Sequence, residues 1–279
     1  MRLVDSHAHL NADRFDVDLD AVLERARAAG LERILVPGWN VRSSERALEL
    51  VAGRPWLDAA VGIHPHDAAK ADAAGWAAVE AWARDERVVA IGETGLDSDR
   101  MFSPWPAQLE NLRRNLALAL ATGKPAILHC RSRAGERDAQ DALVAELRAA
   151  GFDGPAARDA FGGRPPAVVH SFSGPVDYAR ELIAMGLVVS FGGLMFRLGE
   201  EASAEVAPLV PAERLLVETD APFLSPPGAP RARNEPASVA ITARWLAERR
   251  GVGADALGAA LVATYDATFA PATRIAPHG

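Results

Sequence analysis

Two histidines near the start of the chain, His7 and His9, stand two residues apart in the stretch DSHAHL. The apolar residues just before them favour a short β-strand. In an extended chain, side chains two residues apart share one face and lie about 6.6 Å apart along the strand. Two imidazoles on one face are a candidate metal site, whereas each histidine alone is more simply a hydrogen-bonded loop residue.

Other polar residues follow other apolar runs in the same way. They are His64, with His66 just beyond it, Glu93, His129, His170 and Asp220. Of the seven histidines, only His278 falls outside this pattern. Imidazoles and carboxylates that face one cavity are costly to bury unpaired, and a divalent cation removes that cost.

The apolar runs alternate with amphipathic segments. The expected strands cover residues 2–7, 32–38, 57–64, 87–93, 125–130, 166–171, 186–192 and 214–220. Apolar residues recur at three- and four-residue steps, which is typical of helices, in segments 19–30, 108–123, 141–151 and 177–186. The segment 151–166 is rich in Gly, Pro and Ala, and it predicts an extended loop before the sixth strand.

This alternation predicts parallel strands joined by right-handed crossovers. At this length we expect a (β/α)8 barrel of the TIM type, forming a single domain over residues 1–279, with an open doubly wound sheet as the alternative. In such a barrel the C-terminal ends of the strands converge on one mouth, so the polar residues would meet there. The chain has no GxGxxG or GxxxxGK[ST] motif to cradle a nucleotide.

Composition limits the function classes. The chain is 49% hydrophobic, enough for a sizeable core, and its net charge of −7 argues against a broad coating of nucleic acid without excluding a local basic site. One cysteine, Cys130, rules out an internal disulfide and fits a reducing compartment. We see no signal peptide and no membrane-spanning run, and we expect a cytoplasmic protein with no stable protein partner.

The donor types indicate which metals fit. Imidazole nitrogen with carboxylate oxygen suits zinc, manganese, iron or cobalt, and suits magnesium less. Six donors exceed one tetrahedral site, and a carboxylate such as Glu93 can bridge two ions about 3.5–4 Å apart. We therefore expect two divalent metal ions, with zinc, manganese and magnesium as the candidates.

Seven motifs in order carry a family resemblance. They are DSHAHL, GIHPH (62–66), IGETGLD (91–97), LHCR (128–131), HSFSG (170–174), VETDAPFL (217–224) and RNEP (233–236). Together the set resembles the TatD family of metal-dependent hydrolases, a branch of the amidohydrolase-like barrels. The resemblance implies that His7 and His9 bind one metal with Asp220, that His129 and His170 bind a second, and that Glu93 bridges them. Members of this family are similar to deoxyribonucleases that remove nucleotides from DNA 3′ ends, and some resemble deacylases of D-aminoacyl-tRNA.

The chain departs from the family pattern away from these positions. The family usually has an aromatic pair after Asp97, where this chain reads SDRMF (98–102). The stretch between His129 and His170 is also longer than usual. These departures concern the substrate rather than the metal site.

The expected chemistry is hydrolysis by a water that two cations activate. Asp220 would take the proton of the water as base. His64 ends the third strand, further round the mouth, where we expect it either to orient or protonate the scissile group or to hydrogen-bond beside a ligand. Glu218 shares a strand face with Asp220 and would support a neighbouring ligand. Cys130 should point away from His129, as a buried structural thiol rather than a nucleophile.

Charged and aromatic residues bear on the substrate. The arginines after strand ends are Arg100, Arg131, Arg133, Arg197, Arg231 and Arg233, whereas Lys124 precedes a strand and belongs to the opposite end. We expect an anionic substrate, with Arg131, Arg133 and Arg231 as its candidate ligands. The aromatic residues that follow strands could stack on bases or pack under loops: Trp39, Phe102, Trp105, Phe172, Phe196 and Phe223.

We therefore favour a 3′–5′ exodeoxyribonuclease or phosphodiesterase that acts on single-stranded DNA ends or another phosphoester. The alternative is a metal-dependent hydrolase of an ester or carbon–nitrogen bond, such as a D-aminoacyl-tRNA deacylase. A non-catalytic metal- or partner-binding protein is a third hypothesis, which the complete set of donors disfavours.

Overall fold

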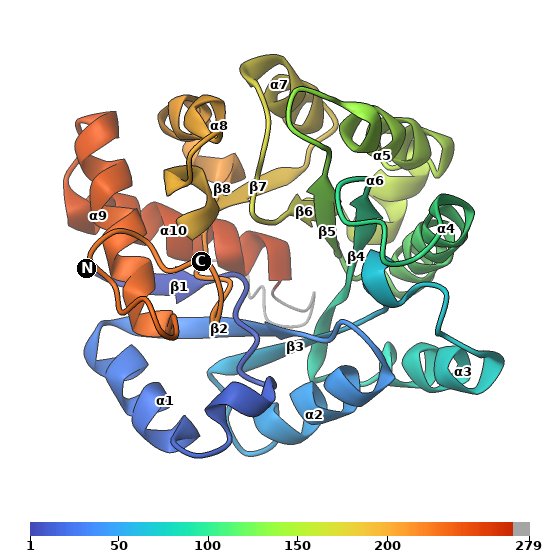
Figure 1. Ribbon diagram of the computed structural model, residues 1–279, viewed down its shortest axis with the longest axis horizontal. Coiled ribbons are helices and arrows are strands. Elements are labelled where there is room, and N and C mark those ends of the chain that lie inside the picture. The colour runs from blue at the N-terminus through green and yellow to red at the C-terminus, as the bar shows by residue number, and fades with distance from the viewer. Residues whose placement is uncertain (270–279) are drawn as a thin grey trace.

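Eight parallel strands form a barrel with helices around it in the computed structural model, which describes residues 1–269 (Figure 1). The strands follow one another in chain order: β1 (Leu3–Asp5), β2 (Leu31–Pro37), β3 (Leu57–Val61), β4 (Val88–Asp97), β5 (Ala126–Arg131), β6 (Ala167–Val169), β7 (Val188–Phe191) and β8 (Leu215–Val217). The helices are α1 (Leu19–Ala28), α2 (Val41–Val51), α3 (Ala73–Trp82), α4 (Trp105–Thr122), α5 (Asp138–Ala149), α6 (Pro155–Phe161), α7 (Val176–Ala184), α8 (Glu201–Val206), α9 (Val239–Arg250) and α10 (Ala254–Phe269). The predicted (β/α)8 barrel is confirmed.

The first and last strands meet just beyond their C-terminal ends. Ala8 and Ala221 form an isolated parallel bridge. The Asp220 N–H donates to the His7 carbonyl oxygen at 2.8 Å, and the His9 N–H donates to the Ala221 carbonyl oxygen at 2.7 Å. The backbone that closes the barrel therefore carries three of the candidate metal ligands. This closure contradicts the alternative of an open sheet.

Strand β4 is longer than the sequence indicated. We expected the strand to end at Glu93, but it continues to Asp97, and Glu93 lies where its register with β5 shifts, between Ile91 and Thr94. Gly92 has a φ of +140°, and a Cβ there would lie 2.6 Å from the carbonyl oxygen of Ile127 on β5. Only glycine tolerates both that conformation and that approach. The irregularity therefore fixes the place of Glu93 within the strand.

The predicted extended loop at 151–166 is wrong, because it contains helix α6. Pro155 occupies the first turn, and Gly162 caps the C-terminus with a φ of +60°. Phe161 is buried and packs against Phe152, with ring centroids 5.7 Å apart. Such a short helix buries too few apolar residues to show a clear period among so many glycines and prolines.

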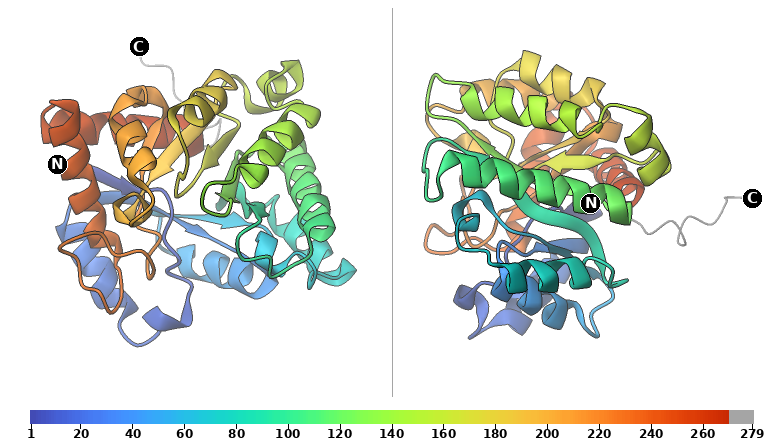
Figure 2. Two further views of the ribbon diagram at one scale, coloured as in Figure 1. Left: turned by 45° about the horizontal axis from the view of Figure 1, so that its top comes forward. Right: turned by 90° about the vertical axis from the view of Figure 1, so that its right-hand side faces the viewer.

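The helices that the three- and four-residue steps predicted, α1, α4, α5 and α7, each bury an apolar face against the strands. Helices α4 and α5 run side by side along one flank (Figure 2), where Arg113 and Glu146 join them in an ion pair of 2.6 Å. Helix α10 packs on β1 at the end opposite the mouth, so closely that a Cβ on Gly258 would lie 2.4 Å from the Arg2 carbonyl oxygen.

His278 lies outside the described residues. Within residues 1–269, no helix combines the length and apolar character that crossing a membrane requires.

Candidate metal centre

Six polar side chains converge inside the mouth of the barrel. They are His7, His9, Glu93, His129, His170 and Asp220, all buried except Asp220, whose side chain is 13% exposed, and His129, whose side chain is 18% exposed. They come from the ends of β1, β5, β6 and β8 and from the irregular part of β4. The structure therefore brings together every residue of the predicted ligand set.

Glu93 stands between two groups of histidines. Its Oε2 lies 3.3 Å from His7 Nε2 and 3.6 Å from His9 Nε2. Its Oε1 lies 2.9 Å from His170 Nε2 and 3.4 Å from His129 Nδ1. Each carboxylate oxygen therefore faces one pair of imidazoles, which is the arrangement that a bridging ligand requires.

Asp220 completes the group on the β1 side. Its Oδ1 lies 3.3 Å from His9 Nε2 and 3.9 Å from His7 Nε2. The two Nε2 atoms of these histidines are only 3.2 Å apart, so both rings point at one place, as their two-residue spacing predicted. Asp220 adopts a φ of +52°, and Ser171, next to His170, adopts a φ of +42°. Such conformations in non-glycine residues are strained and concentrate at functional sites.

The ring nitrogens lie close together as metal ligands do, but not all of them have a hydrogen-bond partner among residues 1–269. His170 Nε2 is buried and has no hydrogen-bond partner within the described residues, although it lies 2.9 Å from Glu93 Oε1. The close groups include His7 with His9 and Glu93, His7 with His170 and Asp220, and Glu93 with His129 and His170, each with donor atoms within 4.8 Å of one another. Buried polar atoms that approach without bonding are expensive unless a cation joins them. The donor set can therefore hold metal ions.

Carboxylates behind the rings fix which nitrogen faces the cavity. His170 Nδ1 lies 3.3 Å from Glu218 Oε1, which also accepts the N–H of Ser171 at 2.7 Å. Burial opposes ionisation of Glu218, but the neighbouring His170 outweighs it and lowers the pKa of Glu218 to about 2. Glu218 therefore supports a candidate ligand, as predicted, and leaves His170 Nε2 turned towards Glu93.

Asp97 plays the same part for His129, and the sequence did not assign it this role. Its Oδ2 lies 3.2 Å from His129 Nε2 and 2.7 Å from His66 Nε2. Burial would raise the pKa of Asp97, but its hydrogen bonds with His129 and His66 hold that pKa well below its usual range. Asp97 follows Glu93 by four residues on the same strand, so the period of two places both on one face. This spacing is the signal that could have found Asp97.

His64 lies closer to the centre than its strand position indicated. Its Nε2 is 3.0 Å from Glu93 Oε1, so it is not far round the mouth. Burial lowers the pKa of His64 to about 4, despite the opposing effect of Glu93. At neutral pH the ring is therefore uncharged, which suits a hydrogen-bonding residue better than a proton donor. His64, His66 and His129 also form a close group that could hold a metal ion.

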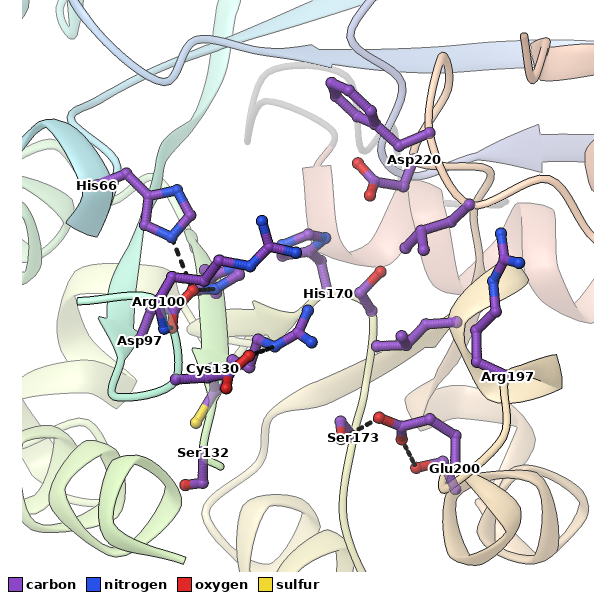
Figure 3. A pocket seen from close by; sticks show the side chains of 18 of the residues that line it. His66, Asp97, Arg100, Cys130, Ser132, His170, Ser173, Arg197, Glu200 and Asp220 are labelled. Atoms are coloured by element: carbon purple, nitrogen blue, oxygen red, sulfur yellow. Dashed lines mark hydrogen bonds and ion pairs between the residues drawn. The ribbon is translucent and has the colours of Figure 1, made fainter. Parts of the chain in front are cut away.

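The centre opens into a cavity of about 1290 Å³. Five of the six predicted mouth arginines line it: Arg100, Arg131, Arg133, Arg197 and Arg231. Figure 3 shows Arg100 and Arg197 on opposite sides of His170, with Asp220 above them in this view. Arg131 binds Asp99 at 2.8 Å across the rim. The prediction for Arg233 is wrong: its guanidinium pairs with Asp18 and Glu235 and does not line the cavity.

The aromatic residues divide in the same way. Trp39, Phe102 and Phe223 line the cavity. Trp105, Phe172 and Phe196 instead pack into the fold, with Phe172 buried between Tyr178 and Phe191. Cys130 is buried as expected, and burial raises the pKa of its thiol to about 12.

A barrel whose mouth gathers histidines and carboxylates around one cavity defines a metal-dependent hydrolase. A family model described as TatD related DNase matches residues 4–270, and the chain belongs to this TatD family. A Bacillus subtilis protein named uncharacterized metal-dependent hydrolase YabD is 38% identical over 246 residues, which cover 88% of this chain and 90% of that protein. The 3′–5′ ssDNA/RNA exonuclease TatD of Klebsiella pneumoniae is 36% identical over 256 residues, which cover 88% and 91%. Among solved structures, the TatD homolog YJJV from Escherichia coli K12 superimposes with a TM-score of 0.84 at 29% identity, covering 96% and 98% of the two chains.

Proposed function

We propose that the protein is a single-domain phosphodiesterase with two metal ions, which removes nucleotides from the 3′ end of single-stranded DNA. The observation that carries this proposal is the place of Glu93, with one oxygen towards each histidine pair. The relative named as a 3′–5′ ssDNA/RNA exonuclease and the arginines around the cavity support the choice of a nucleic acid substrate.

In this proposal the six convergent side chains divide into two sites. His7, His9 and Asp220 would hold one divalent ion, His129 and His170 would hold the other, and Glu93 would serve both. Ions bound in this way would lower the pKa of a water and polarise a phosphate oxygen. The imidazole-rich donor set favours zinc or manganese over magnesium.

The remaining steps fall to side chains of the chain itself. Asp220 faces the cavity and takes the proton of the attacking water as general base. His64, held neutral by burial, orients a phosphate oxygen or the leaving group by a hydrogen bond. Asp97 and Glu218 keep His129 and His170 in the orientations that the centre needs.

The rim supplies the groups that bind the substrate. Arg131, Arg133 and Arg231 line the cavity and offer guanidinium groups that match phosphate geometry. Trp39 and Phe223 both lie against His9, with ring centroids 5.0 and 6.0 Å from its ring. An aromatic ring at this place can stack on the terminal base.

The test is a comparison of three substrates with the metal-reconstituted protein. We expect release of the terminal nucleotide from 3′-labelled single-stranded DNA, and much slower hydrolysis of a D-aminoacyl-tRNA and of a cyclic amide. Glu93→Gln should abolish the release, whereas Glu110→Gln, a control on the exposed surface of α4, should leave it unchanged. Preference for the amide or the aminoacyl ester over DNA would refute the nuclease proposal in favour of the alternative hydrolase.

A further inference from the structure

The arginines of this chain differ in whether another group of the protein pairs with their guanidinium. On the outer surface, guanidinium groups pair with carboxylates, as in Arg2 with Glu32 at 2.6 Å and Arg148 with Glu181 at 2.8 Å. Within residues 1–269, the side chains of a few arginines have no hydrogen bond, ion pair or ring contact: Arg100, Arg133, Arg158, Arg180, Arg197, Arg231 and Arg244. Four of these seven line the cavity at the mouth, namely Arg100, Arg133, Arg197 and Arg231.

Two of the unpaired arginines stand on a wall that hydrogen bonds hold together. We call the loops after β5, β6 and β7 (residues 132–137, 171–175 and 192–200) the loop wall. Gln140 donates to the Ser173 carbonyl oxygen at 3.3 Å, and Ser173 Oγ donates to Glu200 Oε1 at 3.0 Å. Ser203 Oγ donates to Glu200 Oε2 at 2.8 Å and accepts the N–H of Gly174 at 3.1 Å. Gln140 lies on α5 and also accepts a hydrogen bond from the Ser132 hydroxyl, so these bonds join the three loops into one surface.

The other cation of the wall, and the acid at its far end, already have partners, whereas the exposed Glu136 of the first loop has no side-chain partner among the described residues. Arg137 pairs with Asp177 and Asp141. Both oxygens of Glu200 accept hydroxyl hydrogens, and no ion pair joins Glu200 to Arg197 among the described residues. Arg133 and Arg197 are thus the cations that the wall leaves available to a ligand.

The position and size of the cavity indicate what that ligand is. Figure 3 shows Arg197 beyond His170, on the far side from Arg100, so the wall continues the cavity past the metal centre. The cavity volume of about 1290 Å³ exceeds the roughly 300–1,000 Å³ of an ordinary small-molecule site. A ligand that fills it extends beyond the single phosphate at the centre.

We propose that Arg133 and Arg197 on the loop wall form a second phosphate subsite, which binds a backbone phosphate next to the one that is cleaved. This inference rests on the proposed phosphodiesterase function and makes it more specific. The preferred substrate carries several phosphates along one strand, and a dinucleotide with a single phosphodiester leaves the subsite empty.

The test compares (dT)4 with (dT)2 in the wild type and in the double variant Arg133→Ala/Arg197→Ala. Removing a charge-assisted hydrogen bond to a phosphate costs about tenfold in binding. We therefore expect the wild-type kcat/KM to be at least about tenfold higher for (dT)4, and the double variant to lose most of that ratio. The matched control, Arg158→Ala/Arg180→Ala, removes two unpaired arginines outside the cavity and should keep the ratio.

A binding measurement makes the result independent of catalysis. The affinity of a phosphorothioate (dT)4 is measured by fluorescence anisotropy over a range of salt concentrations. The slope of log K against log salt should fall by about 0.7 for each phosphate that Arg133→Ala/Arg197→Ala no longer neutralises.

The two proposals fail in different ways. An unchanged (dT)4 to (dT)2 ratio together with an unchanged salt slope would overturn the subsite and leave the nuclease intact. An equal fall of the ratio in the control variant would also overturn it, because the effect would then be one of overall charge. If the wild type hydrolyses neither oligonucleotide, the nuclease proposal fails, and the salt slope alone decides whether the subsite exists.

Discussion

The two ends of the barrel differ in whether the protein itself supplies partners for their polar groups. At the N-terminal end, Asp58 accepts hydrogen bonds from Arg33 and from the Tyr265 hydroxyl, the latter at 2.8 Å. Lys124, at the same end, donates to the carbonyl oxygens of Ala83 and Asp85, both at 2.7 Å. At the mouth, by contrast, imidazoles crowd around Glu93, and four of the five predicted mouth arginines that line the cavity have no side-chain partner among residues 1–269.

Burial costs free energy at both ends, for Asp58 at one and for the imidazoles and Glu93 at the other, because these groups give up contacts with water. The unpaired arginines of the mouth are exposed and keep those contacts. The N-terminal end recovers that cost within the fold, so its charges contribute to stability. At the mouth, the buried imidazoles and Glu93 recover that cost only when a cation binds, and the exposed arginines stay available to an anion. The pairing of charges therefore separates the residues that hold this barrel together from those that act, and the following predictions test that separation.

The largest effect should come from Glu93→Ala. Removing the carboxylate between the two histidine pairs should lower kcat/KM on 3′-labelled DNA by about 1000-fold or more, since a bound metal lowers the activation barrier by several kcal/mol. The thermal midpoint should stay close to that of the wild type, because the centre is not needed for packing. Loss of the fold in circular dichroism, rather than loss of activity alone, would contradict this interpretation.

Asp58→Ala should have the reverse effect. It leaves Arg33 and the Tyr265 hydroxyl without their acceptor, at a cost of about 3 kcal/mol in the free energy of unfolding, or a fall of roughly 6 °C in the thermal midpoint. Activity of the folded variant should remain within about twofold of the wild type. Tyr265→Phe is the milder comparison, with a loss of about 1 kcal/mol. A drop in activity with no change in the midpoint would break the proposed division between the ends.

Asp97→Asn should weaken metal binding without abolishing it. The amide keeps the size of the side chain but holds His129 less firmly, which should reduce metal affinity about 10–100-fold. Isothermal titration with zinc or manganese measures the change, and Asp99→Asn at the rim is the matched control. Unchanged metal affinity in Asp97→Asn would show that Asp97 serves only the loop after β4.

The smallest effect is expected at Cys130. Burial raises the pKa of this thiol to about 12, so at pH 8 it stays protonated, with a thiolate fraction of about 10⁻⁴. The native protein should react with a thiol reagent far more slowly than the unfolded protein, and Cys130→Ala should retain full activity. Rapid labelling that also inactivates the native protein would place Cys130 in the catalytic machinery instead.

Most of this architecture could be predicted because its signals are periodic. The alternation of strands and helices implied the barrel, and the barrel implied that His7, His129 and Asp220 would meet although they are far apart in sequence. Family motifs then supplied the division into two sites. What could not be predicted depends on local geometry: the extension of β4 beyond Glu93 relies on how closely Gly92 approaches β5.

Side-chain partners were equally hidden from the sequence. Arg231 and Arg233 are nearly adjacent in the chain, yet one lines the cavity and the other is bound by Asp18 and Glu235. Because both arginines follow a strand, the sequence placed both at the mouth. Only the three-dimensional contacts show which guanidinium is already paired with carboxylates. The contacts of Asp97 with His66 and His129 also join residues far apart in the sequence, so they could not be predicted, although the four-residue spacing from Glu93 was a signal for Asp97 itself.

The central claim is that Glu93 lies between two metal ions at the mouth. Anomalous diffraction from crystals grown with zinc or manganese tests it most directly. The account predicts two peaks about 3.5–4 Å apart on either side of the Glu93 carboxylate, one beside His7, His9 and Asp220 and the other beside His129 and His170. A single peak held by His64, His66 and His129, or no peak at all, would contradict it.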